Sequence, residues 1–281
     1  MTRATRVALL LLALFAAAAL VVPAVAPVDP LAIDDVLSAR LLPPLARDGA
    51  GRFHALGTDR FGRDVFVRMM LAARISLAVG IAGSLLATAV GVAVGALAGW
   101  WRGAFDRLTM SVGDALLAVP RLVLLLLVAS LWSPGMTTVV AVLALTGWMS
   151  VARLVRAEVM SVSAYPFVDA ARALGAGGMA LLARHVLPNA LGPAIVATTL
   201  GVGNAILLES GLAFLGLGVQ PPTPSWGNMI AGGRDLIVTA PWVALAPGLA
   251  LVATVLLCTV IGDGVRDRLA GTGAAQLAER A

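Results

Sequence analysis

The sequence predicts an all-α integral membrane protein with six transmembrane helices. Hydrophobic residues make up 60% of its 281 residues and charged residues only 12%, whereas a soluble domain has about 45–50% apolar and about 25% charged residues. The mean hydropathy is +0.96. Apolar stretches close to the roughly 20 residues that a membrane-crossing helix needs alternate with segments that hold most of the arginines. The chain is therefore a membrane protein by composition alone.

Residues 1–28 are expected to form the first span. Two arginines precede an apolar run over residues 7–22, and Ala24-Val25-Ala26 has the small residues of a signal-peptide cleavage site. The run slightly exceeds the roughly 7–15 apolar residues of a signal peptide, and Pro27 would follow the cleaved bond. These features favour an uncleaved helix that enters the membrane from the cytoplasm.

Residues 29–74 form a polar loop of mixed charge that is expected on the outer side. At its end, residues 65–73 have a pattern that predicts an amphipathic helix in the membrane interface, with Arg68 and Arg74 extending toward the headgroups. The simpler interpretation of the loop is a solvated segment with local Asp–Arg pairs, each contributing about 0–1 kcal/mol when exposed.

Residues 75–268 are expected to form a five-helix core. Its spans are predicted at residues 75–101, 116–132, 137–152, 191–208 and 243–261. In the first of these, Gly91, Gly95 and Gly99 fall on one helix face, where small residues let another backbone approach closely. The approaching helix belongs either to the same chain or to a second subunit.

The third span begins close to Pro120 and Arg121, after a short basic connector at residues 102–114. Proline suits the first turn of a helix, and the arginine could extend to the headgroups. A tight turn at residues 133–135 then makes the third and fourth spans a hairpin.

A polar segment, residues 153–189, interrupts the apolar core. Asp169 suits the positive end of a helix, and the alanines that follow it are good helix formers. Gly175 and two further glycines should break this helix, and Pro188 should end a second one over residues 179–187. Two short helices would form a compact, rigid knob, and the simpler interpretation is an ordinary solvated connector.

Asn204 lies inside the fifth span, where an amide needs a partner on a neighbouring helix or in a transport pathway. Residues 209–242 are rich in Gly and Pro and too irregular to cross the membrane as a helix. We expect them to form a re-entrant or capping element on the outer side. Asn204, Glu209 and Trp226 are candidates for a pathway or partner-facing surface.

The arginine distribution favours cytoplasmic N- and C-termini. In that orientation residues 153–189 lie inside, as does the tail that starts at Gly262 and ends in residues 269–281. The outer segments of the core then carry only Arg234. The loop at residues 29–74 opposes this assignment with seven arginines against six aspartates, although acidic residues contribute little to the rule.

The sequence contains no lysine. A P-loop needs a lysine and so does a Schiff-base enzyme, so the chain can perform neither chemistry by itself. His54 and His185 lie far apart and lack neighbours at the spacing of a metal site, so no metal or cofactor is expected on this chain. Cys258 is expected to be a small buried hydrophobe. The net charge of +5 lies largely at span ends and in loops, which favours anionic lipid or protein partners over nucleic acid.

Four blocks, in this order, resemble the C-type permease subunit of ABC importers for dipeptides, oligopeptides and nickel. They are His54-Ala-Leu-Gly-Thr-Asp59 with Gly62-Arg63-Asp64, Asp114-Ala-Leu-Leu-Ala-Val-Pro120, Asp169-Ala-Ala with Gly175 and Leu187-Pro188, and Phe214-Leu-Gly-Leu-Gly with Pro221-Pro-Thr-Pro-Ser-Trp226-Gly. The resemblance covers residues 54–268 and implies the six-helix, MetI-like architecture of type I importer permeases in the bacterial inner membrane. The third block is similar to the family's EAA loop.

In that family the EAA loop supplies the coupling helix that seats in a groove of the cytoplasmic ATPase. Carried over to this chain, the docking residues are Asp169, Ala170, Ala171, Arg172, Gly175, Arg184 and Pro188. The family usually has Glu where this chain has Asp169, which keeps the charge and shortens its reach. Arg121 stands where apolar residues are more usual.

The resemblance implies a non-catalytic subunit that forms half of a translocation pathway. Its partners would be a B-type permease subunit in a heterodimer, two ATPase subunits that bind ATP and Mg, and an extracytoplasmic solute-binding protein. The substrate would be dipeptides or oligopeptides, and nickel importer permeases share the same blocks.

Two other classes of function are weighed against this one. A stand-alone secondary transporter would often show inverted repeats and mid-membrane charges, whereas no convincing internal repeat is visible and the central spans hold almost no ionisable group. A membrane-embedded enzyme would need a reactive cluster, and the sequence shows none.

Overall fold

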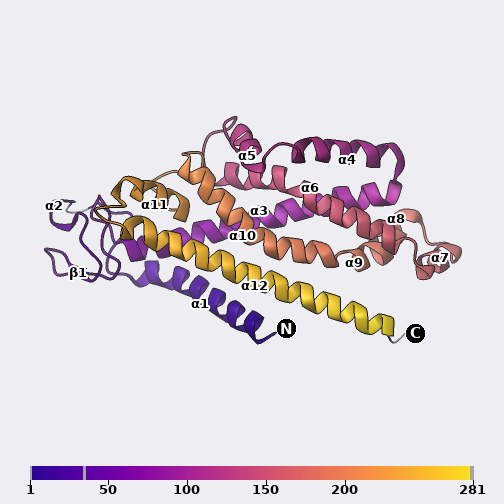
Figure 1. Ribbon diagram of the computed structural model, residues 1–281, viewed down its shortest axis with the longest axis horizontal. Helices are drawn as coiled ribbons and strands as arrows, with labels where there is room; N and C mark the ends of the chain where they lie inside the picture. Colours follow the sequence, from indigo (N-terminus) through magenta and orange to yellow (C-terminus); the bar gives the residue numbers. More distant parts are fainter. Residues whose placement is uncertain (1, 34–35, 279–281) are drawn as a thin grey trace.

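Long helices lie side by side along the molecule, and short elements cover both of its ends (Figure 1). The computed structural model describes residues 2–33 and 36–278, so the last residues of the expected tail, 279–281, lie outside the described residues. In chain order the elements are α1 (Arg3–Val25), α2 (Val36–Ala39), β1 (Ala46–Arg47), β2 (Phe53–His54), α3 (Val65–Trp101), α4 (Gly103–Leu117), α5 (Arg121–Ala129), α6 (Met136–Val162), α7 (Pro166–Ala173), α8 (Gly178–Leu181), a π-helical turn (Leu182–Val186), α9 (Leu187–Ala190), α10 (Gly192–Phe214), α11 (Trp226–Gly233), a 3-10 turn (Arg234–Leu236) and α12 (Trp242–Ala278).

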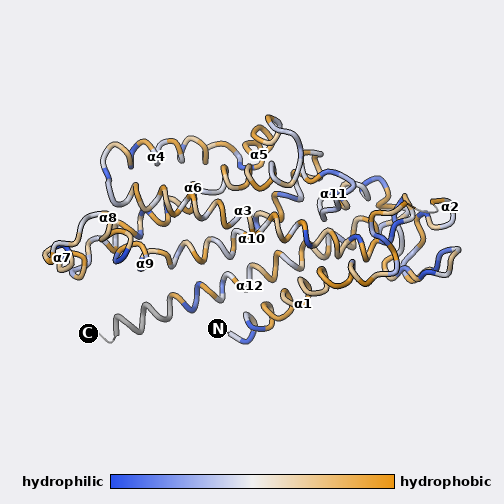
Figure 2. Tube along the Cα trace, turned by 180° about the vertical axis from the view of Figure 1, so that it is seen from behind, coloured by the Kyte–Doolittle hydropathy of each residue, from blue (hydrophilic) through white to orange (hydrophobic). Residues whose placement is uncertain are grey.

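Within the described residues, five helices are long and apolar enough to cross a membrane: α1, α3, α6, α10 and the part of α12 up to Leu269. A sixth candidate is α4 with α5, which are bent by 94° relative to each other. Hydrophilic residues are abundant in the loops around α2, whereas the long helices are mostly hydrophobic (Figure 2). The prediction of an all-α membrane protein is confirmed.

The third span, predicted over residues 116–132 with proline in its first turn, is divided between two helices in the structure. Helix α4 ends at Leu117 and α5 begins at Arg121. Because Pro120 lacks an N–H group and disfavours a helical conformation in the residue before it, the chain turns at this point. The expected connector at residues 102–114 is also different, since nearly all of it belongs to α4.

Helix α3 begins earlier than predicted, because the expected interfacial helix is its first part. The Asp64 carboxylate caps it by accepting a hydrogen bond from a backbone N–H of the first turn at 2.9 Å. Arg68 donates to the Pro30 carbonyl at 2.9 Å, and Arg74 donates to the Ala19 carbonyl at 2.7 Å. These guanidinium groups bind the chain's own carbonyls instead of extending to the headgroups as predicted.

The glycines of α3 lie against the backbone of α6. A Cβ on Gly91 would lie 2.7 Å from the Trp148 carbonyl oxygen, and one on Gly99 would lie 2.8 Å from that of Arg156. Gly95 is also closely covered by the α6 backbone. Of the two partners left open by the sequence, the structure places a helix of the same chain on this face.

Helix α12 continues past residue 261, where the sixth span was predicted to end. Its glycines in this region lie in close contact with neighbouring helices: a Cβ on Gly262 would lie 2.8 Å from Leu200 Cγ of α10, and one on Gly264 would meet Thr5 of α1. The start of the expected tail is therefore a packed helical segment.

The region that combines α11 with the loop that precedes α3 is named the outer capping region here, after the side on which the sequence predicts it. Residues 209–214 of the segment expected to cap the molecule continue α10, and α11 follows after an irregular stretch. The Ser225 hydroxyl accepts a hydrogen bond from the Asn228 N–H at 3.3 Å, while the Asn228 side chain accepts one from the Ser225 N–H at 3.0 Å. This capping box fixes the start of α11, which packs against α10 and α12.

Candidate functional site

Residues 166–190 form a compact projection at one end of the molecule, which we call the coupling knob (Figure 1). After α7 the chain turns at Gly175, whose φ of 90° is a left-handed conformation that favours glycine. Helix α8, the π-helical turn and α9 then lead into α10. Pro188 was predicted to end the second helix and instead lies in α9. The preceding π-helical turn widens the backbone, which accommodates a residue without an N–H group.

Apolar side chains fasten the coupling knob to the ends of α3 and α6. Its buried members are Val168, Leu181, Leu182, Val186 and Ala190, which pack with Ala96, Val151, Val155, Val159 and Val162. On α3, the Trp100 indole nitrogen lies 3.8 Å from where a Cβ on Gly178 would be. The knob is thus a packed element, not a solvated connector.

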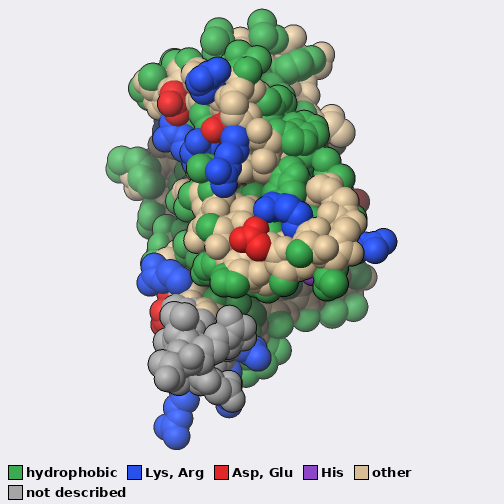
Figure 3. Space-filling model, turned by 90° about the vertical axis from the view of Figure 1, so that its right-hand side faces the viewer, with side chains coloured by type: hydrophobic (Ala, Val, Ile, Leu, Met, Phe, Trp, Pro, Cys, Tyr) green, Lys and Arg blue, Asp and Glu red, His purple; other side chains and the backbone are tan. Residues whose placement is uncertain are grey.

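The outward surface of the knob carries most of the predicted docking residues. Those exposed are Asp169, Ala170, Arg172, Gly175, Arg184 and Pro188, and Ala171 is half-buried. Arg172 donates a 2.9 Å hydrogen bond to the Asp169 carboxylate, so these two charges pair with each other. Seen from this end, the molecule shows more basic than acidic side chains (Figure 3).

The knob also exposes apolar side chains that sequence reasoning did not single out. Leu174 is 90% exposed at the turn after α7, and Phe167 and Met179 are exposed as well. The rings of Tyr165 and Phe167 meet edge to face with centroids 6.1 Å apart. The sequence feature that could have identified them is the presence of large apolar residues inside a polar segment. Exposed apolar groups are found at protein contact surfaces and at membrane contact surfaces alike.

Glu209 and Trp226 are fully buried within the chain, which corrects their prediction as pathway or partner-facing residues. The Trp226 backbone N–H donates to Ser76 Oγ at 3.2 Å, and Ser76 Oγ donates to Glu209 Oε2 at 3.4 Å. The Trp226 indole N–H donates to the Met69 carbonyl at 3.2 Å. These bonds join α11 to α3 and α10, so both residues hold the outer capping region in place.

Asn204 is exposed at a cavity of about 170 Å³ between α3, α5, α6 and α10. The other polar side chains that line this cavity are Ser84, Thr88, Arg121 and Ser150. Of the three site candidates Asn204, Glu209 and Trp226, Asn204 alone keeps a surface on which a substrate or a partner helix can lie.

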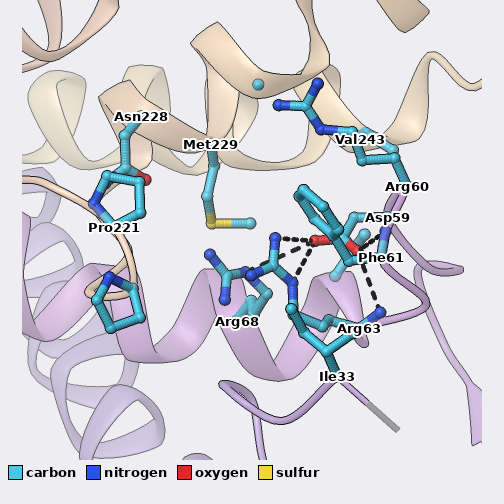
Figure 4. Close-up of a pocket in the computed structure, with 13 residues that line it drawn as sticks. Ile33, Asp59, Arg60, Phe61, Arg63, Arg68, Pro221, Asn228, Met229 and Val243 are labelled. Carbon is cyan, nitrogen blue, oxygen red and sulfur yellow. Dashed lines mark hydrogen bonds and ion pairs between the residues drawn. The ribbon is translucent and has the colours of Figure 1, made fainter. Parts of the chain in front are cut away.

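A larger cavity, of about 450 Å³, lies at the end of the molecule opposite the coupling knob, between the loop before α3, α11 and the start of α12 (Figure 4). Arg60, Arg63 and Arg68 line it, together with Asp59. Asp59 Oδ2 accepts a hydrogen bond from Arg63 Nε at 2.8 Å and lies 3.9 Å from Arg68 Nε. Three cationic groups face one carboxylate, so the lining carries a positive potential that attracts anions.

The simpler interpretation of residues 29–74 was a solvated loop. The part of it beside this cavity is instead packed. His54 is buried, with Nδ1 2.7 Å from Asp64 Oδ2 and Nε2 3.6 Å from Asp48 Oδ2. Burial raises the pKa of Asp48, but hydrogen bonds from Arg52 outweigh burial and lower the pKa to about 2. The loop is therefore a rigid platform at the cavity's edge.

Comparison with known proteins gives a consistent family. Residues 91–271 match the model described as "Binding-protein-dependent transport system inner membrane component". The chain is 38% identical over 267 residues to a putative peptide transport system permease protein of Brucella suis biovar 1 (strain 1330), covering 95% of this chain and 87% of that protein. It is 40% identical over 261 residues to the di/tripeptide transport system permease protein DppC of Pseudomonas aeruginosa (strain UCBPP-PA14), covering 93% and 86%.

A third relative is the glutathione transport system permease protein GsiD of Pectobacterium atrosepticum, 39% identical over 222 residues, with 79% of this chain and 74% of that protein covered. Among solved structures, an inward-facing MetNI methionine ABC transporter has a chain with a similar fold, with a TM-score of 0.60 and 19% identity over 73% of this chain and 96% of that chain. The chain therefore belongs to the family of binding-protein-dependent transport system inner membrane components, as a multi-pass permease subunit of an ABC importer.

Proposed function

We propose that this chain forms half of the translocation pathway of a peptide importer, paired with a B-type permease subunit. The observation that carries the substrate class is the identity of 38–40% to permeases whose names specify peptides, di- and tripeptides or glutathione. A binding-protein-dependent importer works with an ATPase and a binding protein. We infer two ATPase subunits, which hold the ATP and Mg.

We place the coupling knob and both termini on the cytoplasmic side. Arg102, Arg172, Arg184 and Arg266 are exposed. They lie between α3 and α4, in α7, in the π-helical turn and late in α12, and arginine enrichment of this kind marks the cytoplasmic side. The first turn of α1 and the last turn of α12 also lie toward the knob and away from α2 (Figure 1). In this orientation the outer cavity faces the binding protein.

The knob would transmit ATP-driven closure of the ATPase to the membrane helices. Its exposed apolar residues, led by Leu174, suit a groove on the ATPase, and Arg184 can pair with an acidic groove wall. Because buried side chains fasten the knob to α3 and α6, movement of the ATPase would move those helices as a rigid body. Asn204 would line the pathway between the two permease subunits.

The test is reconstitution of the chain with its B-type subunit, ATPase and binding protein in proteoliposomes. We expect uptake of labelled dialanine that requires ATP, the binding protein and every subunit. Equal uptake by the chain alone would identify a stand-alone secondary transporter instead. Uptake of Ni²⁺ but not of dialanine would assign the nickel branch of the family.

A further inference from the structure

Arg121 stands at the bend between α4 and α5 and lines the cavity that Asn204 also lines. Its Nη2 lies 3.1 Å from where a Cβ on Gly147 would be. The missing side chain at Gly147 thus leaves room for the guanidinium beside α6. The bend therefore brings a cation from α5 against the middle of a spanning helix.

The cavity lies near the middle of the membrane-crossing helices. Gly147 and Ser150 are near the centre of α6 (Met136–Val162), and Asn204 is near the centre of α10 (Gly192–Phe214). Ser84, which also lines the cavity, is near the centre of α3. At this depth a charged side chain that faces lipid is costly, and such residues instead face a water-filled path or a partner.

Three of the polar side chains at this cavity have no hydrogen-bond partner within the part of the chain that the structure describes: Arg121, Ser150 and Asn204. All three are exposed. Ser84, by contrast, donates to the Thr198 carbonyl at 2.9 Å. Unsatisfied groups from α5, α6 and α10 therefore converge on one opening, which is what a ligand-binding surface requires and a lipid-facing surface does not tolerate.

The charge of the cavity selects the ligand. Among its described lining residues Arg121 is the one ionisable group, and no carboxylate balances it. A guanidinium has five N–H donors in a planar fork that matches a carboxylate. Ser150 and Asn204 add neutral polar groups that can bind a peptide backbone.

We propose that Arg121 binds the carboxylate of the transported peptide as it passes through the middle of the membrane. This inference rests on the proposed peptide importer and names the chemical group that the pathway recognises. An unmodified linear peptide carries a C-terminal carboxylate, so the contact would be independent of the side-chain sequence of the substrate.

The test uses the complete transporter in proteoliposomes and two labelled substrates, dialanine and dialanine amide, which lacks the carboxylate. Each is supplied at a concentration that saturates the binding protein, measured separately by calorimetry. The variants are Arg121→Gln and Arg121→Lys. The matched control is Arg107→Gln, which removes an exposed arginine of α4 that does not line the cavity.

We expect Arg121→Gln to lower the uptake of dialanine about ten- to a hundredfold, the range for losing a hydrogen bond to a charged group. Uptake of dialanine amide should stay within about twofold. Arg121→Lys, which keeps the charge, should retain more dialanine uptake than Arg121→Gln. ATPase activity stimulated by the binding protein should persist in all variants, and Arg107→Gln should transport as the wild type does.

Two results would overturn the inference. One is dialanine uptake by Arg121→Gln at the wild-type rate. The other is an equal loss of both substrates, which would mean that Arg121 pairs with an acidic residue of the B-type subunit and supports assembly. A wild-type complex that transports neither peptide would contradict the proposed function itself, which is a different outcome from either of these.

Discussion

The Arg156 guanidinium donates two hydrogen bonds to the Asp106 carboxylate, one of them from Nη2 at 2.7 Å, and so ties α4 to α6. Asp106 is mostly buried. Replacing Asp106 by Asn would leave the Arg156 charge partly buried without its counter-charge. We expect the free energy of unfolding to fall by about 1–3 kcal/mol, measured by thermal unfolding in detergent, with faster hydrogen exchange in α4.

The control for this variant is Asp169→Asn, which breaks the Asp169–Arg172 pair on the exposed surface of the knob. An exposed pair contributes only about 0–1 kcal/mol, so this variant should unfold close to the wild-type temperature. Equal losses in the two variants would show that the Asp106–Arg156 pair has no special role in holding α4.

A substitution at Gly95 should separate α3 from α6. A Cβ there would collide with the backbone at Ala152, so Gly95→Ala should destabilise the protein by about 1–3 kcal/mol through overpacking. Gly248→Ala is the matched control, because Gly248 lies in α12 and has open space around its Cβ position. Alanine is the better helix former, so the control should be neutral or slightly stabilising in thermal unfolding.

Leu174→Ser should weaken association with the ATPase without affecting the fold. Leu174 is 90% exposed, so its replacement costs the isolated chain little, whereas the loss of an interface residue that carries binding energy costs more than about 1 kcal/mol. Val238→Ser is the control, since Val238 is also 90% exposed but lies just before α12, at the opposite end. Co-purification of the ATPase measures both, and a loss of association in Val238→Ser alone would contradict the assignment of the knob.

Acid should loosen the outer loop through Asp48. Its pKa is lowered to about 2 in the folded chain from the ordinary value of 3.8. A depressed carboxyl pKa contributes stability that is complete above the unfolded value and lost as the pH falls through the folded one. Hydrogen exchange in residues 46–54 should therefore increase between about pH 4 and pH 2. Asp48→Asn should abolish that dependence, and an unchanged pH profile in this variant would assign it to another carboxylate.

Composition and apolar run length were enough to predict the fold class, because a membrane-crossing helix is set mainly by hydrophobicity. The break in the third span was harder to predict. Pro120 and Pro188 have the same backbone chemistry, yet the chain turns by 94° beside Pro120 and stays helical at Pro188, which follows a π-helical turn. The difference depends on packing, because buried neighbours such as Val186 and Ala190 keep the backbone around Pro188 helical. No local sequence pattern predicts that these neighbours are buried.

The site residues also fall into two groups: those whose environment is set by neighbours in the sequence, and those whose environment is set by residues far along the chain. The polar character of the knob was visible in the sequence because its residues are contiguous. The burial of Glu209 depends on Ser76 and Trp226, and Arg68 is held by the Pro30 carbonyl. These partners are far apart along the chain, so the sequence alone predicted exposed groups where the structure has internal hydrogen bonds.

Helix α3 extends without interruption for 37 residues, a length of about 55 Å. Arg68 at one end lines the outer cavity, and Trp100 at the other lies beside the coupling knob. The helix therefore connects the coupling knob directly to the cavity at the other end of the molecule. Tilting it by about 5° around its inner end displaces its outer end by about 5 Å. A small rotation of the knob thus becomes a displacement of one helical turn at the mouth of the outer cavity.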